Sequence, residues 1–153
     1  MKLSLRGEYA LRALVVLGEN YGEEVVRIQA ISQKQNIPKR FLDQILNDLK
    51  SAKIVESKRG IAGGYRLAVP PDKIKLATVV RHIEGALAPI SCVSAGFYEK
   101  CTCPDEATCG IRSVMKEVRD AIVKILESTT IADVCQRVRH LEQHASHTFE
   151  YII

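Results

Sequence analysis

The stretch RIQAISQKQNIPKRFLDQILNDLKSAKIVESKRGIAGGYRL, residues 27–67, decides the fold of this chain. Apolar residues at helical spacing predict one helix over residues 27–36 and a second over about 38–52. Pro38 follows a short turn and suits the first position of the second helix. Residues 54–67 then form two strand-like runs around a Gly-rich turn, which predicts a β-hairpin.

The helix over 38–52 separates apolar residues from polar ones. One face is an apolar stripe, expected to face the core, made of Phe41, Leu42, Ile45, Leu46 and Leu49. The other face is polar, with residue types that can contact phosphates and base edges: Lys39, Arg40, Asp43, Gln44 and Asn47. For this helix taken alone, a solvated surface opposite a core is the simpler interpretation.

The hairpin strengthens the expectation of a nucleic-acid partner. Lys58, Arg59 and Arg66 supply cations for phosphate contacts, while Gly63 and Gly64 let the backbone turn tightly and approach a phosphate closely. The order helix, turn, helix and basic hairpin is that of a winged helix-turn-helix, whose second helix enters the major groove. The expected fold class is therefore mostly α with a small β-hairpin wing.

Charge is unevenly divided along the 153 residues. Residues 1–70 hold 12 Lys/Arg against 7 Asp/Glu, a net of +5, whereas residues 71–153 hold 10 against 11, a net of −1. The basic first part favours a polyanion partner. No apolar run approaches the roughly 20 residues of a membrane helix, so we expect a cytoplasmic protein without a membrane partner. No nucleophile–base pairing, P-loop or dinucleotide motif occurs, so we expect no enzymatic activity.

We expect three parts in the chain. Residues 1–85 form the winged helix-turn-helix domain, residues 86–110 an irregular cysteine-bearing sensor loop, and residues 111–153 a dimerisation helix and a C-terminal helix. The first part also includes helices predicted over 4–18 and 76–84.

The long helix of the third part is expected to start near residues 105–108 and to reach about residue 126. Its two apolar rows predict packing against another helix, either within this chain or in a second copy. A last helix is expected from Thr130, because Thr130 and Asp133 have the spacing of a capping box, to about Ser146.

Five cysteines occur, and four of them lie between residues 92 and 109. The odd count argues against a disulfide framework, so clustered thiols favour a metal, an iron–sulfur cluster or redox chemistry. The four clustered thiols are Cys92, Cys101, Cys103 and Cys109. A zinc site formed by all four and a thiol switch without metal both remain open. Cys135, alone in a helix, is interpreted as a small buried hydrophobe.

Four stretches carry a resemblance to a known family: GEYALRALVVL (7–17), residues 27–55, ESKRGIAGGYRLAVPPDKIKLATVVRHIEG (56–85) and TIADV (130–134). They are similar to the Rrf-type transcriptional regulators, which include IscR, NsrR and CymR. The resemblance implies a homodimeric DNA-binding repressor or activator that pairs through the helix over 111–126 and binds double-stranded DNA at a palindromic operator. The DNA contacts implied are Gln29, Ser32, Pro38, Lys39, Arg40, Gln44, Asn47, Lys58, Arg59, Gly63 and Gly64.

The resemblance also implies a cofactor, a labile 2Fe–2S cluster that acts as a redox sensor. Family members with a cluster hold it by three loop cysteines, of which Cys103 and Cys109 match the last two. Cys92 is favoured as the third ligand, with Cys101 as its rival. Arg112 stands where some members have a histidine ligand. Glu8 matches the place of an acidic ligand that other members supply from the partner subunit.

The last predicted helix has a row of histidines. His140, His144 and His147 follow one another at intervals of four and three residues, so they share one helical face. Such a row can bind a divalent ion or can simply be a solvated surface, and the sequence leaves both interpretations open.

Overall fold

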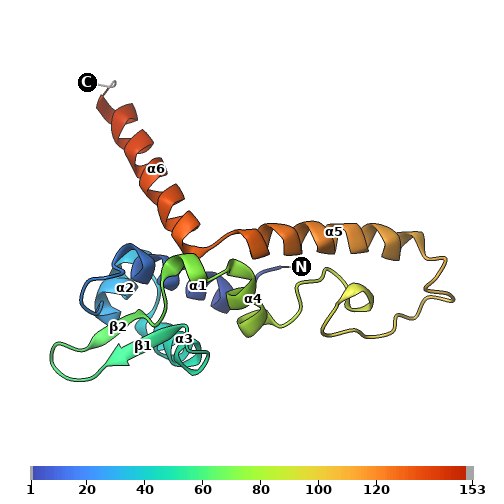
Figure 1. Cartoon of the computed structure of the whole chain (residues 1–153), viewed down its shortest axis with the longest axis horizontal. Coiled ribbons are helices and arrows are strands. Elements are labelled where there is room, and N and C mark those ends of the chain that lie inside the picture. Colours follow the sequence, from blue (N-terminus) through green and yellow to red (C-terminus); the bar gives the residue numbers. More distant parts are fainter. Residues whose placement is uncertain (1, 151–153) are drawn as a thin grey trace.

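The structure is a computed structural model that describes residues 2–150, with side chains described through residue 145. The chain forms six α-helices within these residues, two 3₁₀ turns and one two-stranded antiparallel sheet. Figure 1 shows a compact winged part, a long helix that runs away from it and a last helix that projects in another direction. The irregular segment after α4 lies beside the long helix.

The winged part has the predicted order of elements. It consists of α1 (Leu5–Glu19), α2 (Ile28–Gln35), α3 (Lys39–Ser51), β1 (Val55–Lys58), β2 (Gly64–Leu67), a 3₁₀ turn at Pro71–Lys73 and α4 (Leu76–Glu84). Strands β1 and β2 pair with Val55 opposite Leu67 and Lys58 opposite Gly64. A bridge between Val26 and Tyr65 ties the wing to the segment before α2. The predicted winged helix-turn-helix fold is therefore confirmed.

The apolar stripe of α3 faces the core. Leu42, Ile45, Leu46 and Leu49 are buried, and only Phe41 of the stripe is exposed. The core is completed by α1 and by the start of α6 (Ile131–Glu150), whose Ile131 and Cys135 are also buried. Burial raises the pKa of the Cys135 thiol, in keeping with its predicted place as a small hydrophobe in the core.

Two helix starts differ from the expectation. Pro38 lies one residue before α3, because its backbone is extended (ψ 130°) rather than helical. The long helix α5 spans Gly110–Ser128 and starts after the predicted 105–108, because Asp105 holds a local turn. Its carboxylate accepts hydrogen bonds from the Ala107 N–H (3.0 Å) and the Thr108 hydroxyl (2.9 Å).

The predicted capping box of the last helix is present. The Asp133 carboxylate accepts a hydrogen bond from the Thr130 N–H (2.7 Å), and the Thr130 hydroxyl accepts one from the Asp133 N–H (3.2 Å). Two further backbone bonds join this junction to the segment before α4: Leu76 N–H to the Thr129 carbonyl and Ile131 N–H to the Ile74 carbonyl, both 2.9 Å. The helix continues to Glu150, beyond the expected end.

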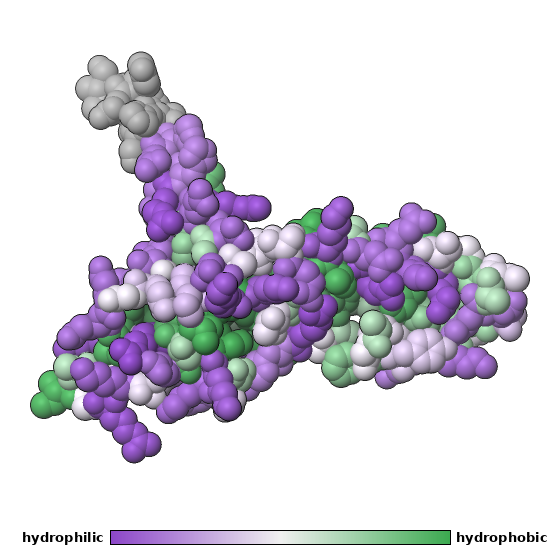
Figure 2. All heavy atoms as spheres, viewed as in Figure 1, coloured by the Kyte–Doolittle hydropathy of each residue, from purple (hydrophilic) through white to green (hydrophobic). Residues whose placement is uncertain are grey.

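The two apolar rows of α5 have different environments. Val123 and Leu126 pack against a small core of Ala77, Val80 and Leu87. The other row is open: Ile111 is 70% exposed, Val114 55% and Ile125 63%. Figure 2 shows hydrophobic side chains reaching the surface along α5, whereas the outer part of α6 is mainly hydrophilic. No helix among the described residues is long and apolar enough to cross a bilayer.

Candidate nucleic-acid interface and cysteine site

The polar face of α3 lies on the surface of the winged part. Because the opposite stripe is buried, the side chains of this face point outward, and Pro38, Lys39, Arg40, Gln44 and Asn47 are all exposed. The Arg40 guanidinium stacks over the Phe41 ring at 4.8 Å from its centroid, which orients this cation without neutralising it. The helix therefore presents donors and acceptors of the kind that read a DNA groove.

The Ser32 hydroxyl, by contrast, makes a hydrogen bond within the fold. It donates to the Ile37 carbonyl at 2.6 Å and so holds the turn between α2 and α3. Asn36 ends α2 in the left-handed conformation (φ 50°). The turn is thus stabilised by its own side chains. Because a hydroxyl has one hydrogen, Ser32 can donate to a phosphate only by giving up its bond to the Ile37 carbonyl.

The wing depends on two glycines, because any other residue at these positions would force the neighbouring backbone to shift. A Cβ on Gly64 would lie 2.5 Å from the Val26 carbonyl oxygen, and a Cβ on Gly63 would collide with the Lys58 carbonyl oxygen. These glycines therefore let the wing close onto itself and onto the segment before α2. The wing tip carries Ile61, which is 100% exposed.

The N-terminus of α2 and the wing line one cavity of about 430 Å³, formed by Arg27, Gln29, Gly60, Ile61 and Gly63. No side chain caps the first N–H groups of α2, and such groups attract anions. Sequence reasoning found Gln29 but missed Arg27. The only signal for Arg27 was a cation at the first residue of a predicted helix.

The cations of this surface lack acidic partners within the described residues. Arg27, Lys39, Arg40, Lys58 and Arg59 form no ion pair there, whereas Arg66 pairs with Glu56 across the wing. Five cations on three neighbouring elements thus remain available to a polyanion.

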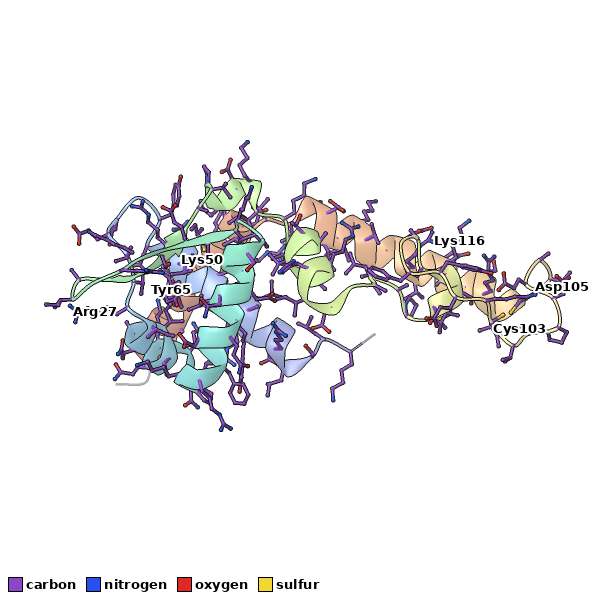
Figure 3. All side chains as sticks on the ribbon, turned by 90° about the horizontal axis from the view of Figure 1, so that it is seen from below. Arg27, Lys50, Tyr65, Cys103, Asp105 and Lys116 are labelled. Atoms are coloured by element: carbon purple, nitrogen blue, oxygen red, sulfur yellow. The ribbon has the colours of Figure 1, made fainter. Side chains whose placement is uncertain are left out.

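The clustered cysteines lie at the other end of the molecule. Figure 3 shows Arg27 near the wing and Cys103 with Asp105 at the far end of the chain's long dimension. The four thiols of Cys92, Cys101, Cys103 and Cys109 line one cavity of about 360 Å³, together with Arg112 and Ile111. The folding of residues 86–109 therefore brings together the four loop cysteines predicted from the sequence.

Polar contacts hold the cysteine loop in place. The Arg112 guanidinium donates to the Cys92 carbonyl (3.3 Å), and the Arg112 N–H donates to the Cys109 sulfur (3.4 Å). The Glu106 carboxylate accepts from the Cys101 N–H (3.2 Å) and from the Tyr98 hydroxyl (2.8 Å). Glu106 and Tyr98 were not singled out from the sequence, since no motif marks them.

The thiols influence one another's ionisation. Hydrogen bonds with Cys101 and with Cys109 raise the pKa of Cys103 to about 12, and burial followed by the nearby Cys101 raises the pKa of Cys92. Thiolates this close repel one another, so they ionise together only when a cation compensates their charge.

Two of the four sulfurs have the spacing of metal-bound thiolates. Cys103 Sγ and Cys109 Sγ lie 4.0 Å apart, close to the roughly 3.8 Å between two thiolates on a tetrahedral ion with metal–sulfur bonds of about 2.3 Å. Among the described residues, however, no three His, Cys, Asp or Glu side chains are placed to hold one ion. Among the described residues, the spacing of metal-bound thiolates is thus limited to the Cys103–Cys109 pair.

Glu8 lies apart from these thiols. It belongs to α1, forms an ion pair with Arg12 at 3.5 Å and is not among the residues that line the cysteine cavity. Within one chain the structure therefore does not bring Glu8 to the loop cysteines.

The fold and the unpaired cations on α3, α2 and the wing define a winged helix-turn-helix DNA-binding protein. Comparison with known proteins specifies it further. The family model Rrf2, described as "Iron-dependent Transcriptional regulator", matches residues 3–137. The chain belongs to the Rrf2 family of transcriptional regulators, and its relatives are regulators rather than enzymes.

Individual relatives agree with this assignment. A Rhodobacter capsulatus protein named "rrf2-like" is 38% identical over 83% of this chain and 87% of its own length. The solved structure of CymR, the global cysteine regulator of B. subtilis, superimposes with a TM-score of 0.76 at 30% identity and covers 90% of this chain and 98% of that one. That of T. potens IscR gives a TM-score of 0.71 at 28% identity, with coverage of 90% and 88%.

Proposed function

We propose that this regulator binds an operator through α3, the N-terminus of α2 and the wing, and that an iron–sulfur cluster in the cysteine loop controls its affinity. The observation that carries the proposed DNA binding is the set of five cations that form no ion pair with another described residue. Lys39, Arg40, Gln44 and Asn47 on α3 are assigned to the major groove and its backbone, with Pro38 beside them. The wing contacts are assigned to Lys58, Arg59, Gly63 and Gly64, and the phosphate contacts of α2 to Gln29 and Ser32.

The proposed active form is a homodimer. The open row of α5 exposes Ile111, Val114, Val118 and Ile125 along one face of a 19-residue helix. An apolar face of this kind is stabilised when it packs against the same face of a second copy. Two winged parts joined in this way would suit an operator with two-fold symmetry.

The proposed cofactor is a 2Fe–2S cluster held by Cys92, Cys103 and Cys109, with Cys101 as the rival of Cys92 or as a fourth thiolate ligand. Support comes from the shared cavity, the 4.0 Å sulfur pair and the family description as iron-dependent. Such a cluster supplies a centre that can be oxidised or lost. An oxygen ligand from Glu8 of a second subunit is the alternative to one of the four thiolates.

The chain's own contacts connect the cysteine loop to the winged part. The Arg119 guanidinium donates to the Val93 carbonyl at 2.6 Å, and the Phe97 ring covers Gly85 at the end of α4. A change in loop conformation therefore alters the contacts of α4 and α5. These helices connect the loop to the winged part and to a second copy. In this way the state of the loop biases the DNA affinity.

A cluster-free thiol switch is the second candidate. The Cys103 and Cys109 sulfurs are 4.0 Å apart, so a small movement under an oxidant would join them in a disulfide. The relative CymR is the global cysteine regulator of B. subtilis. A single zinc site held by the four thiols is a further alternative, since all four line the same cavity.

The proposed DNA-binding surface is tested by fluorescence anisotropy with labelled genomic fragments at several salt concentrations. Arg59→Ala is expected to weaken binding to all fragments and to reduce the salt slope by about 1. Arg66→Ala is the matched control, because its charge is already paired with Glu56 in the same wing. Equal losses in the two variants, or no binding by the wild type at low salt, would contradict the proposed surface.

The proposed iron–sulfur cluster is tested by anaerobic purification, followed by iron and sulfide quantitation and a visible absorption spectrum. Cys103→Ser is expected to lose iron, whereas Cys135→Ala, at the buried cysteine of the core, is expected to keep it. A colourless protein that binds DNA and takes up no iron on reconstitution would remove the cluster and leave the thiol switch. Glu8→Gln decides whether the oxygen ligand is used.

A further inference from the structure

Two histidines on α6 face each other outside the interface and the cysteine site. His140 Nε2 and His144 Nε2 lie 3.1 Å apart, with ring centroids 4.4 Å apart and the rings nearly perpendicular at 83°. Both residues are exposed. They also lie beyond residue 137, where the match to the family model ends.

We propose that His140 and His144 form a surface site for a divalent transition-metal ion such as Ni²⁺ or Zn²⁺. Metal–nitrogen bonds of about 2.0–2.1 Å place two imidazole nitrogens roughly 2.9 Å apart at a right angle and roughly 3.4 Å apart at the tetrahedral angle. The observed 3.1 Å falls between these values. The two donors are thus spaced for one ion.

Helical geometry explains this spacing. Residues four apart are neighbours on a helix surface, so α6 itself holds the two rings on one face. The sequence places another histidine, His147, at the next position of the same face. Imidazole is a preferred ligand of zinc, copper and nickel, and an all-imidazole set discriminates against magnesium and calcium.

The site is open to an incoming ion. His140 lines a broad cavity of about 840 Å³ with Gln136 and Gln143, so solvent reaches its ring. Water or a chelator can occupy the coordination positions that the two imidazoles leave free. Bound metal would join two successive turns of the outer part of α6, beyond the turns that Ile131 and Cys135 anchor in the core.

The experiment uses the full, untagged chain on a column of Ni²⁺ immobilised on iminodiacetate. The wild type is expected to be retained and then eluted with imidazole. The matched variant combines Glu142→His with His144→Glu, which keeps composition and charge but moves the two histidines to opposite faces of α6. Ni²⁺ binding by this variant, measured by titration calorimetry, is expected to be weaker by about tenfold or more. The loop thiols are present in both proteins, so the difference reports the histidine pair.

A second measurement locates the ion. Substoichiometric Ni²⁺ is expected to broaden the amide NMR signals of residues 136–145 in the wild type and to leave them sharp in the exchanged variant. Broadening confined to residues 92–109, or equal column retention of both proteins, would overturn the proposal. Failure of the wild type to be retained would overturn it as well.

Discussion

The winged end and the cysteine end of this molecule are built by different forces. The winged end is organised around buried side chains from five helices, with Leu14, Leu17, Leu42 and Leu46 fully buried at its centre. The cysteine end buries few apolar side chains, and polar bonds from Glu106, Arg112 and Arg119 position its loop. The comparison indicates that burial of apolar side chains stabilises the winged end, whereas hydrogen bonds of polar side chains position the loop at the cysteine end.

The largest expected effect tests the core of the winged end. Leu46→Ala should lower the free energy of unfolding by about 2–5 kcal/mol, because it leaves a cavity among fully buried side chains. Urea unfolding followed by circular dichroism measures this loss. The matched control is Val114→Ala on the open row of α5, where monomeric protein should lose much less. Equal losses would mean that α5 is as deeply packed as the winged core, and the contrast between the two ends would fail.

A smaller effect is expected at the wing. Gly64→Ala places a methyl group 2.5 Å from the Val26 carbonyl oxygen, and the forced backbone shift should cost about 1–3 kcal/mol. DNA binding by anisotropy should weaken, while the iron content stays at the wild-type level. A variant that binds DNA normally would show that the wing can close without this contact.

These positions also show what the sequence could and could not predict. The helix over residues 76–84 was predicted at the bounds that α4 has, because its apolar residues recur at a single period up to Gly85. The polar face of α3 and the four clustered thiols were likewise predicted, since residue type and spacing alone mark them. Contacts without a periodic pattern were not predicted. Glu106 bonds to Tyr98 and Cys101, eight and five residues away in the irregular loop, and no motif marks such contacts. The place of Arg27 beside the wing brings together distant segments and arises only when the chain folds.

The start of α5 was also not predicted correctly from the sequence pattern. Asp105 satisfies its hydrogen bonds in a turn of its own, so α5 begins only after Cys109. No periodicity of apolar residues reports such competition between a turn and a helix. The same limit applies to Gly63 and Gly64, which were assigned to phosphate approach and which the fold also requires for its own closure.

A substitution at the junction between the two ends is expected to have a smaller effect on stability. Thr130→Ala removes the side-chain cap of α6 and should lower the free energy of unfolding by about 0.5–2 kcal/mol. Hydrogen bonds from Thr130 hold the pKa of Asp133 below its usual value. The resulting stability is present above the unfolded-state pKa of about 3.9 and is lost as the pH falls through the lower folded-state pKa. Unfolding measured from pH 7 to pH 2 should therefore show the difference between wild type and variant shrinking in acid.

The smallest effect is expected at the cysteine end without metal. In reduced, metal-free protein, Cys103→Ser combined with Cys109→Ser should change the free energy of unfolding by less than about 0.5 kcal/mol, because both side chains are partly exposed. The same pair of substitutions should abolish the iron content. A large loss of stability in the metal-free state would show that the thiols pack as a core, and the distinction between the two ends would have to be withdrawn.

The paired backbone bonds between the segment before α4 and the α5–α6 junction set the angle at which α5 leaves the winged part. At 1.5 Å per residue, the 19 residues of α5 act as a lever about 28 Å long. A tilt of roughly 10° at this pivot displaces the tip by about 5 Å, which exceeds the axial rise of one base pair, about 3.4 Å. In the proposed dimer through α5, the rigidity of these backbone bonds would therefore limit the half-site separations that the two winged parts can span.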